Sequence, residues 1–173
     1  MLQRTRLLLA IAALLCTASA WADDPAAVRI GFLLNFARYV EWPELTLKPG
    51  ASLRLCLAPG DAEMAAQFGE IARQVIQGRP TEVKLLPRPA EANGCHLIYL
   101  PAEVPGTLSA WRSAAEHAGA VTVSDMPDFI DAGGMIGLVP VAGRYRFDIN
   151  LAVARQANLR LSSQLLKLAR TVK

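Results

Sequence analysis

Three short and largely apolar runs of residues limit the folds that this chain can adopt. They occupy residues 53–58, 95–100 and 120–124. The run over residues 95–100 is nearly all apolar, as expected of a strand that is covered on both faces of a sheet. Segments of helical length, with apolar residues every three or four positions, separate the three runs. The alternation predicts an α/β fold with parallel core strands.

The remaining segments complete a single-domain architecture. We predict helices over residues 26–40, 61–77, 105–117, 151–157 and 162–171, and a helical turn over 128–131. We predict strands over residues 53–58, 81–86, 95–100, 120–124, 135–141 and 145–150. The last two strands flank a short turn and form a hairpin, and right-handed crossovers place the first strand between the second and the third. The expected fold is a flavodoxin/Rossmann-like three-layer α/β sandwich, with a mostly parallel sheet and an antiparallel terminal hairpin.

The first residues have the pattern of a secretory signal peptide. Arg4 and Arg6 precede an apolar run over residues 7–15, and Ala20-Trp21-Ala22 offers small residues at a cleavage site. The apolar run is too short to cross about 30 Å of hydrocarbon. We expect cleavage after residue 22, which assigns residues 1–22 to the signal peptide and 23–173 to an exported, soluble domain.

Charge is distributed unevenly along the chain. Without Arg4 and Arg6, 16 basic residues face 15 acidic ones, a balance that argues against nucleic acid as a partner. From residue 144 onward only Asp148 is acidic. The basic residues there are Arg144, Arg146, Arg155, Arg160, Lys167, Arg170 and Lys173. Such an end suits an acidic protein surface or anionic lipid headgroups, or it is simply a solvated helix face.

Only two cysteines remain in the predicted mature domain, Cys56 and Cys95. In an oxidising compartment such a pair forms one disulfide, and two buried free thiols are the alternative. The domain has no cluster of histidines and cysteines, so we expect no zinc site.

Residues that could carry out catalysis are few. Ser124-Asp125 follows a strand end, where α/β sites lie, but no base is near it in the sequence. His96 lies inside an apolar strand and His117 closes a helix, so both are interpreted as structural. We therefore expect a protein that is not an enzyme, with a hydrolase using Ser124 as a remote alternative. A crevice between Pro59-Gly60 and Ser124-Asp125 would suit a small ligand instead.

Two features favour binding to another protein. The first predicted helix and the residues after it carry Phe32, Phe36, Tyr39 and Trp42, for which core packing is the alternative. The C-terminal segment is amphipathic and either covers its own sheet or presents a groove to a partner. Its leucines are Leu151, Leu159, Leu161, Leu165, Leu166 and Leu168.

Five motifs follow one another along the chain. They are GFLLNFARYVEWP, LRLCLAPGD, NGCHLIYLP, VTVSDMPDFIDAGGMIGLV and RYRFDINLAVARQANLRLSSQLLKLAR. Together they resemble the YfiR-like family of periplasmic proteins over residues 30–170. The resemblance implies a periplasmic repressor that binds the periplasmic sensor portion of an inner-membrane diguanylate cyclase and lowers cyclic-di-GMP output. An outer-membrane, peptidoglycan-associated lipoprotein would sequester it.

The resemblance also implies roles for particular residues. It identifies Cys56 and Cys95 as the family's structural disulfide. Some members carry a second cysteine pair, which Ile130 and Gly137 replace here, so the resemblance implies no redox control for this chain. The positions that match partner contacts are Asp148, Leu151, Ala154, Leu161 and Leu166. No cofactor is implied, a homodimer is compatible with the family, and other sensors such as histidine kinases remain alternative partners.

Overall fold

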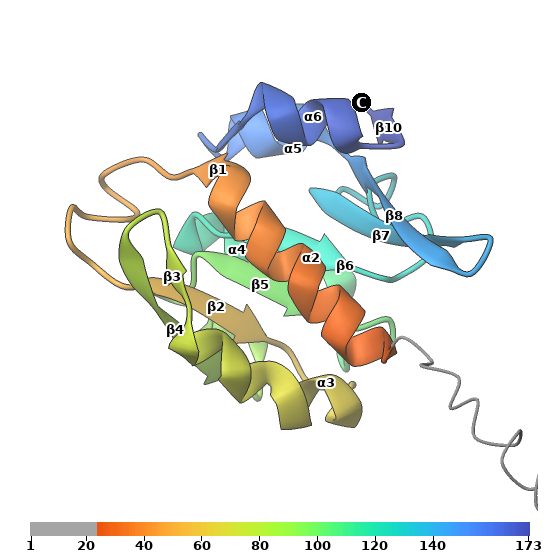
Figure 1. The fold of residues 1–173 in the computed structure, drawn as a ribbon, viewed down its shortest axis with the longest axis horizontal. Coiled ribbons are helices and arrows are strands. Elements are labelled where there is room, and N and C mark those ends of the chain that lie inside the picture. Colours follow the sequence, from red (N-terminus) through yellow and green to blue (C-terminus); the bar gives the residue numbers. More distant parts are fainter. Residues whose placement is uncertain (1–23) are drawn as a thin grey trace, which may run out of the picture.

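The computed structural model describes residues 24–173 and contains one mixed eight-stranded sheet. The strands lie in the order β10-β8-β7-β6-β5-β2-β4-β3, with helices packed on both sides of the sheet (Figure 1). The helices are α2 (Pro25–Tyr39), α3 (Ala62–Gln67), α4 (Leu108–Ala118), α5 (Leu151–Gln156) and α6 (Ser163–Leu168). The 3-10 segments are η1 (Phe68–Arg73) and η2 (Pro89–Glu91). The strands are β1 (Val40–Glu41), β2 (Leu53–Leu57), β3 (Val75–Ile76), β4 (Arg79–Leu85), β5 (Leu97–Leu100), β6 (Val121–Ser124), β7 (Ile136–Val141), β8 (Arg144–Ile149), β9 (Arg160–Leu161) and β10 (Thr171–Val172).

The centre of the sheet is parallel and its ends are mixed. Strands β4, β2, β5, β6 and β7 run parallel to one another, while β8 pairs antiparallel with β7 across the predicted hairpin. Ala142 and Gly143 form the hairpin turn with positive φ angles of 48° and 75°, as a tight two-residue turn requires. Strand β2 lies between β4 and β5, so the predicted fold class and strand order are confirmed.

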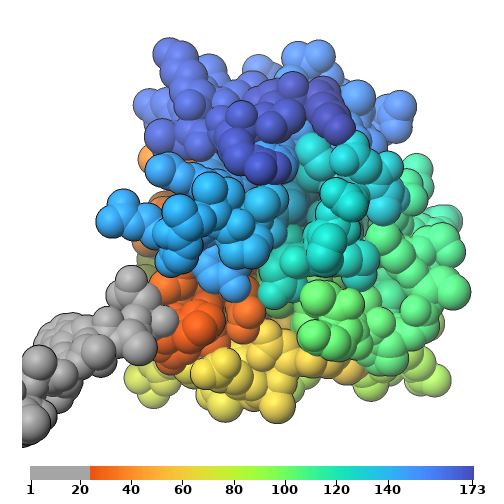
Figure 2. All heavy atoms as spheres, turned by 90° about the vertical axis from the view of Figure 1, so that its right-hand side faces the viewer, coloured from red at the N-terminus to blue at the C-terminus, as the bar shows by residue number. Residues whose placement is uncertain are grey.

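Two apolar cores lie on opposite faces of the sheet, which confirms the predicted three layers. Helices α2, α3, α5 and α6 cover one face and share a core with β2, β5, β6, β7 and β8. Helix α4, η2 and the loop containing Phe129 cover the other face. Residues 151–173 gather at one end of the molecule (dark blue in Figure 2).

Helix α2 begins where its sequence provides a cap. The carboxylate of Asp24 accepts hydrogen bonds from the backbone N–H groups of Ala26 and Ala27, and Pro25 occupies the first turn. Both features are favourable at a helix N-terminus. Core packing explains its aromatic residues, since Phe36 is buried and Phe32 meets the ring of Phe147 edge-on, with 6.1 Å between ring centroids.

The predicted disulfide is present. Cys56 in β2 is bonded to Cys95, which directly precedes β5, and their Cα atoms lie 6.0 Å apart. Both residues are fully buried in the core beneath α4. The bond links two neighbouring strands across a sequence separation of 39 residues.

The helix predicted over residues 61–77 is wrong in its second half. Helix α3 ends at Gln67, and the chain continues as the 3-10 segment η1 and then as β3. A turn at Gln77-Gly78, with φ angles of 52° and 72°, folds β3 back onto β4. Pairing at the sheet edge therefore overrides the helical pattern of the sequence.

The last predicted helix is also too long. Ser162 caps α6 as expected, but the helix ends at Leu168 and residues 171–172 form β10. Strand β10 pairs parallel with β8, whose outer edge would otherwise leave backbone groups unpaired. The loop at residues 128–131 does form the expected turn, in which Asp131 N–H donates to the Asp128 carbonyl.

The predicted signal peptide lies outside the described residues. Within residues 24–173, no helix combines the length and the apolar composition needed to cross a bilayer.

Candidate functional site

The C-terminal segment holds all five predicted partner-contact residues. Asp148 lies in β8, Leu151 and Ala154 in α5, Leu161 in β9 and Leu166 in α6. The structure brings these elements together at one end of the sheet, where β9 pairs with β1 and α6 packs against α2. The five residues therefore belong to one region, although they do not share one degree of exposure.

The three leucines among them are half-buried. Leu151, Leu161 and Leu166 pack against the core under α2 and still reach the surface. Ala154 is fully buried. The most exposed apolar side chains of this region are instead Leu168, with 65% of its surface exposed, and Val172, with 42%. The predicted contacts came from the family resemblance, which pointed to neither Leu168 nor Val172.

Asp148 forms an ion pair with Arg170 of the same chain. Its Oδ1 accepts a 2.8 Å hydrogen bond from Arg170 Nε, and Oδ2 pairs with another guanidinium nitrogen of the same residue. Hydrogen bonding to Arg170 lowers the pKa of Asp148, and the same contact raises the pKa of Arg170. Since Arg170 directly precedes β10, the pair fastens the last strand to β8.

The carboxyl edge of the parallel sheet is occupied by a side chain from α2. Arg29 donates from Nη2 to Asp61 at 2.7 Å and from Nη1 to Asp125 at 3.2 Å. Asp61 follows β2 and also caps α3, and Asp125 follows β6 and accepts from the N–H of Ala102. The crevice predicted between Pro59-Gly60 and Ser124-Asp125 is thus bridged by Arg29. Arg29, set among apolar residues near the start of the predicted helix, was the available signal for this role.

Tyr99 lies next to this ionic cluster. It is fully buried, and its hydroxyl has no hydrogen-bond partner among residues 24–173; nor has Nε of Arg29. Burial raises the pKa of Tyr99, and the charge of Asp125 raises it further. Burial alone would lower the pKa of Arg29, but the negative charges of Asp61 and Asp125 hold it above its usual value.

The residues considered for catalysis have structural contacts. Ser124 is buried, and its hydroxyl accepts a 3.0 Å hydrogen bond from Met126 N–H, which makes it the expected capped turn. His96 is a core histidine, as predicted: its Nδ1 accepts from the N–H of Arg54 at 2.9 Å. Burial lowers the pKa of His96.

Residues 24–173 contain no group of three or more histidine, cysteine, aspartate or glutamate side chains suited to a metal ion.

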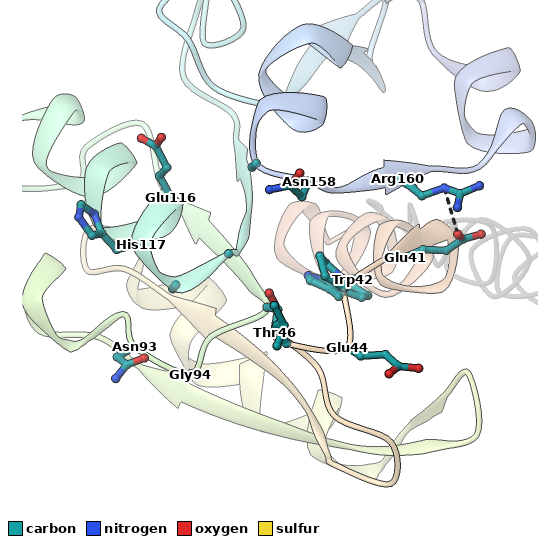
Figure 3. A pocket seen from close by; sticks show the side chains of 15 residues that line it. Glu41, Trp42, Glu44, Thr46, Asn93, Gly94, Glu116, His117, Asn158 and Arg160 are labelled. Atoms are coloured by element: carbon teal, nitrogen blue, oxygen red, sulfur yellow. Dashed lines mark ion pairs between the residues drawn. The ribbon is translucent and has the colours of Figure 1, made fainter.

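A groove of about 880 Å³ opens at the amino edge of the sheet (Figure 3). Trp42 and Glu44 come from the segment after α2, Glu116 from the end of α4, and Arg160 from β9. Arg160 pairs with Glu41 at 3.6 Å, and the indole N–H of Trp42 donates to the His96 carbonyl at 2.9 Å. The sequence did not predict this groove, because its walls come from four separate segments.

Two of the smaller hollows on the surface bear on the predicted sites. One of about 470 Å³ lies at the carboxyl ends of β2 and β4 and is largely apolar, with Pro59, Gly60 and Leu85 in its walls. Another, of about 420 Å³, lies between the loop at residues 125–131 and β7, and Ile130 and Gly137 line it together.

The fold and these surfaces define a class: a three-layer α/β protein whose sheet edge is closed by its own arginine and whose C-terminal segment exposes apolar side chains among basic ones. Comparison with known proteins gives the family. The sequence pattern of the YfiR/HmsC-like family matches residues 26–170, and the chain belongs to that family. Members are known as periplasmic regulators in cyclic-di-GMP signalling. The family expected from the sequence motifs is confirmed.

One solved structure with a similar fold is a conserved domain protein from Vibrio cholerae O1 biovar El Tor. The TM-score is 0.51 with 14% sequence identity, and the match covers 86% of this chain and 60% of that one. The chain thus spans about three fifths of that protein's length, and the likeness concerns the fold alone. A search of curated proteins found no match.

Proposed function

We propose that this protein is a periplasmic repressor of an inner-membrane diguanylate cyclase. It binds the periplasmic sensor portion of the cyclase and thereby lowers cyclic-di-GMP output, without transforming a substrate. The observation that carries this proposal is the family match, which extends over residues 26–170 and so includes nearly every described element. An outer-membrane, peptidoglycan-associated lipoprotein that sequesters the repressor would relieve the inhibition.

The contact surface in this proposal is the C-terminal segment. Leu151, Leu161 and Leu166 are held in place by core packing and keep part of each side chain at the surface. Preorganised apolar groups lose little conformational entropy on binding, which favours their use as anchors. The Asp148–Arg170 pair and the buried Ala154 support the surface from beneath instead of touching the partner.

The mechanism is a shift between two conformations of the cyclase. A regulator that binds the inactive conformation more tightly shifts the population toward it, by no more than the difference between the two binding free energies. Moving a sensor from almost fully active to almost fully inactive needs about 5.5 kcal/mol of differential binding. A few well-packed leucines within a polar rim can supply a difference of this size.

The test uses substitutions that remove surface without inserting a buried charge. Leu161→Ala and Leu166→Ala variants, produced in a strain lacking the wild-type gene, should raise cyclic-di-GMP above the level of the complemented strain. Val83→Ala is the matched control, because Val83 is also half-buried against the same core but lies in β4, toward the other edge of the sheet. Equal periplasmic abundance of all three variants is required. Full repression by both leucine variants would reject this surface.

A second candidate is a small-molecule-binding module that signals to a membrane receptor or a histidine kinase. The apolar pocket of about 470 Å³ beside Pro59 and Gly60 favours it, since this volume falls within the range of ligand sites. A ligand that binds there should raise the melting temperature of wild-type protein and not that of an Ala65→Trp variant, which fills the pocket. The absence of any such shift across a library of amino acids and nucleotides would remove this candidate.

A further inference from the structure

Charge is strongly segregated in this molecule. Residues 24–143 contain nine basic and thirteen acidic residues, whereas residues 144–173 contain seven basic residues and only Asp148 as an acid. We call the second group the basic cap; it comprises β8, α5, β9, α6 and β10. All seven of its basic residues are exposed. A net charge of opposite sign at one end of a small protein gives it a directional electrostatic field.

Several of these basic groups are free of acidic partners. Arg170 pairs with Asp148, Lys173 with Asp131, and Arg160 with Glu41. Among residues 24–173, Arg144, Arg146, Arg155 and Lys167 form no ion pair. Their charge is available to an external anion.

Exposed aliphatic side chains lie within the same cap. Leu168 ends α6 next to Lys167, and Val172 lies in β10. Val172 is paired with Ile149 in the parallel register, so both side chains point to the same face of the sheet. Ile149 belongs to the core that α6 covers, which places Val172 on the side of the sheet where α6 lies. The cap therefore presents two exposed aliphatic groups on one side, among basic residues.

We propose that the basic cap binds an anionic lipid bilayer. Lysine and arginine side chains meet the phosphate headgroups, and Leu168 and Val172 enter the interfacial region. Interfacial membrane-binding elements combine these two features, a basic polar surface and apolar side chains. Arg170, Thr171 and Lys173 of the cap line the hollow of about 420 Å³, but Lys167, Leu168 and Val172 line none of the grooves and pockets described above. These three side chains therefore suit a flat bilayer surface. The inference goes beyond the proposed repressor function, because it concerns where the protein resides and requires no cyclase.

The test is partitioning of the purified mature domain onto lipid vesicles. The wild-type protein should sediment together with vesicles that contain phosphatidylglycerol at about 0.1 M salt. It should remain in the supernatant with vesicles of phosphatidylcholine alone. Binding should weaken strongly at about 1 M salt, where the Debye length falls to about 3 Å. The Arg155→Glu/Lys167→Glu variant should lose roughly tenfold or more of its partition coefficient. Leu168→Ser should also lower it severalfold.

Matched controls come from the opposite edge of the sheet. Leu85 in β4 is 57% exposed, similar to Leu168, and Lys48 is exposed in the segment before β2. The Leu85→Ser and Lys48→Glu variants should bind as wild type does, and unchanged melting temperatures would show that all variants are folded. If the wild-type protein does not bind anionic vesicles, the proposal is overturned. An acidic protein surface would then be the better partner for the basic cap. Equal losses in the controls, or no effect of Leu168→Ser, would also contradict it.

Discussion

Arg29 and Asp125 are 96 residues apart in the sequence, and Nη1 of the arginine lies 3.2 Å from Oδ2 of the aspartate. The same guanidinium binds Asp61 at 2.7 Å. One side chain of α2 thus joins the ends of β2 and β6, at the sheet edge where α/β proteins commonly bind ligands.

Replacing Arg29 should be among the most destabilising single changes in the protein. Arg29→Met leaves Asp61 and Asp125 largely buried without their cation, and removing one partner of a buried pair costs about 3–5 kcal/mol. Arg29→Lys keeps the charge but cannot reach both carboxylates with a planar fork, so its loss should be smaller. Urea unfolding measures both. Arg38→Met, in the same helix but exposed, is the control.

The pairing of Asp148 with Arg170 should control the order of β10. Asp148→Asn removes the charge, and we expect faster amide hydrogen exchange at Arg170 and Lys173, whose N–H groups donate to Phe147 and Ile149. Because the pKa of Asp148 is lowered by folding, its stabilisation is present above the unfolded value of about 3.9 and is lost as pH falls through the folded value. The variant should therefore lose less stability than wild type on acidification below about pH 4.

The disulfide should contribute substantially to stability. Exchanging both Cys56 and Cys95 for alanine should cost about 2–5 kcal/mol and reduce periplasmic abundance. Titration of the unreduced, denatured wild-type protein should reveal no free thiol from these residues. Two reactive thiols under those conditions would contradict the bond.

A second disulfide should form at Ile130 and Gly137, the positions that the resemblance matches to a second cysteine pair. A Cβ atom added to Gly137 would lie 3.4 Å from Cγ2 of Ile130, which is ordinary contact distance. The Ile130→Cys/Gly137→Cys variant should therefore oxidise without reductant, and thiol titration of the denatured protein should detect neither cysteine. Ile130→Cys alone should show one free thiol. Two free thiols in the double variant would mean that these positions do not correspond to the family's cysteine pair.

Stability should decrease on mild acidification because of His96. Its Nδ1 accepts from Arg54 N–H, and protonation would place a second donor there. Since burial lowers the pKa of His96 in the folded state, its stabilisation is complete above about pH 6.5, the unfolded value, and is lost as pH falls toward the folded value. Urea midpoints between about pH 8 and 5 measure the decrease. A His96→Gln variant, whose amide oxygen can accept the same hydrogen bond, should have a flatter profile.

Local patterns in the sequence were sufficient for the family, the fold class and the disulfide pair. Largely apolar runs identified the strands over residues 53–58, 95–100 and 120–124, and the nearly all-apolar run at 95–100 indicated a strand that is covered on both faces. The helix caps at Asp61 and Ser162 could also be predicted, because the first N–H groups of a helix need a nearby side-chain acceptor. These features depend only on neighbours in the sequence.

Only the tertiary structure decided which strands lie at the ends of the sheet. It also decided that the carboxyl edge, where α/β proteins commonly bind ligands, is occupied by Arg29. Strands β3 and β10 are two residues long and exist because a neighbouring strand offers unpaired backbone groups, a condition that helical periodicity cannot reveal. Arg29 closes the sheet edge because folding brings together carboxylates 32 and 96 residues away from it. The charge of the basic cap was readable in the sequence, but only folding places β8, α5, α6 and β10 together at one end of the molecule. Contacts between distant residues determine these features, and the sequence of one segment carries no record of its distant neighbours.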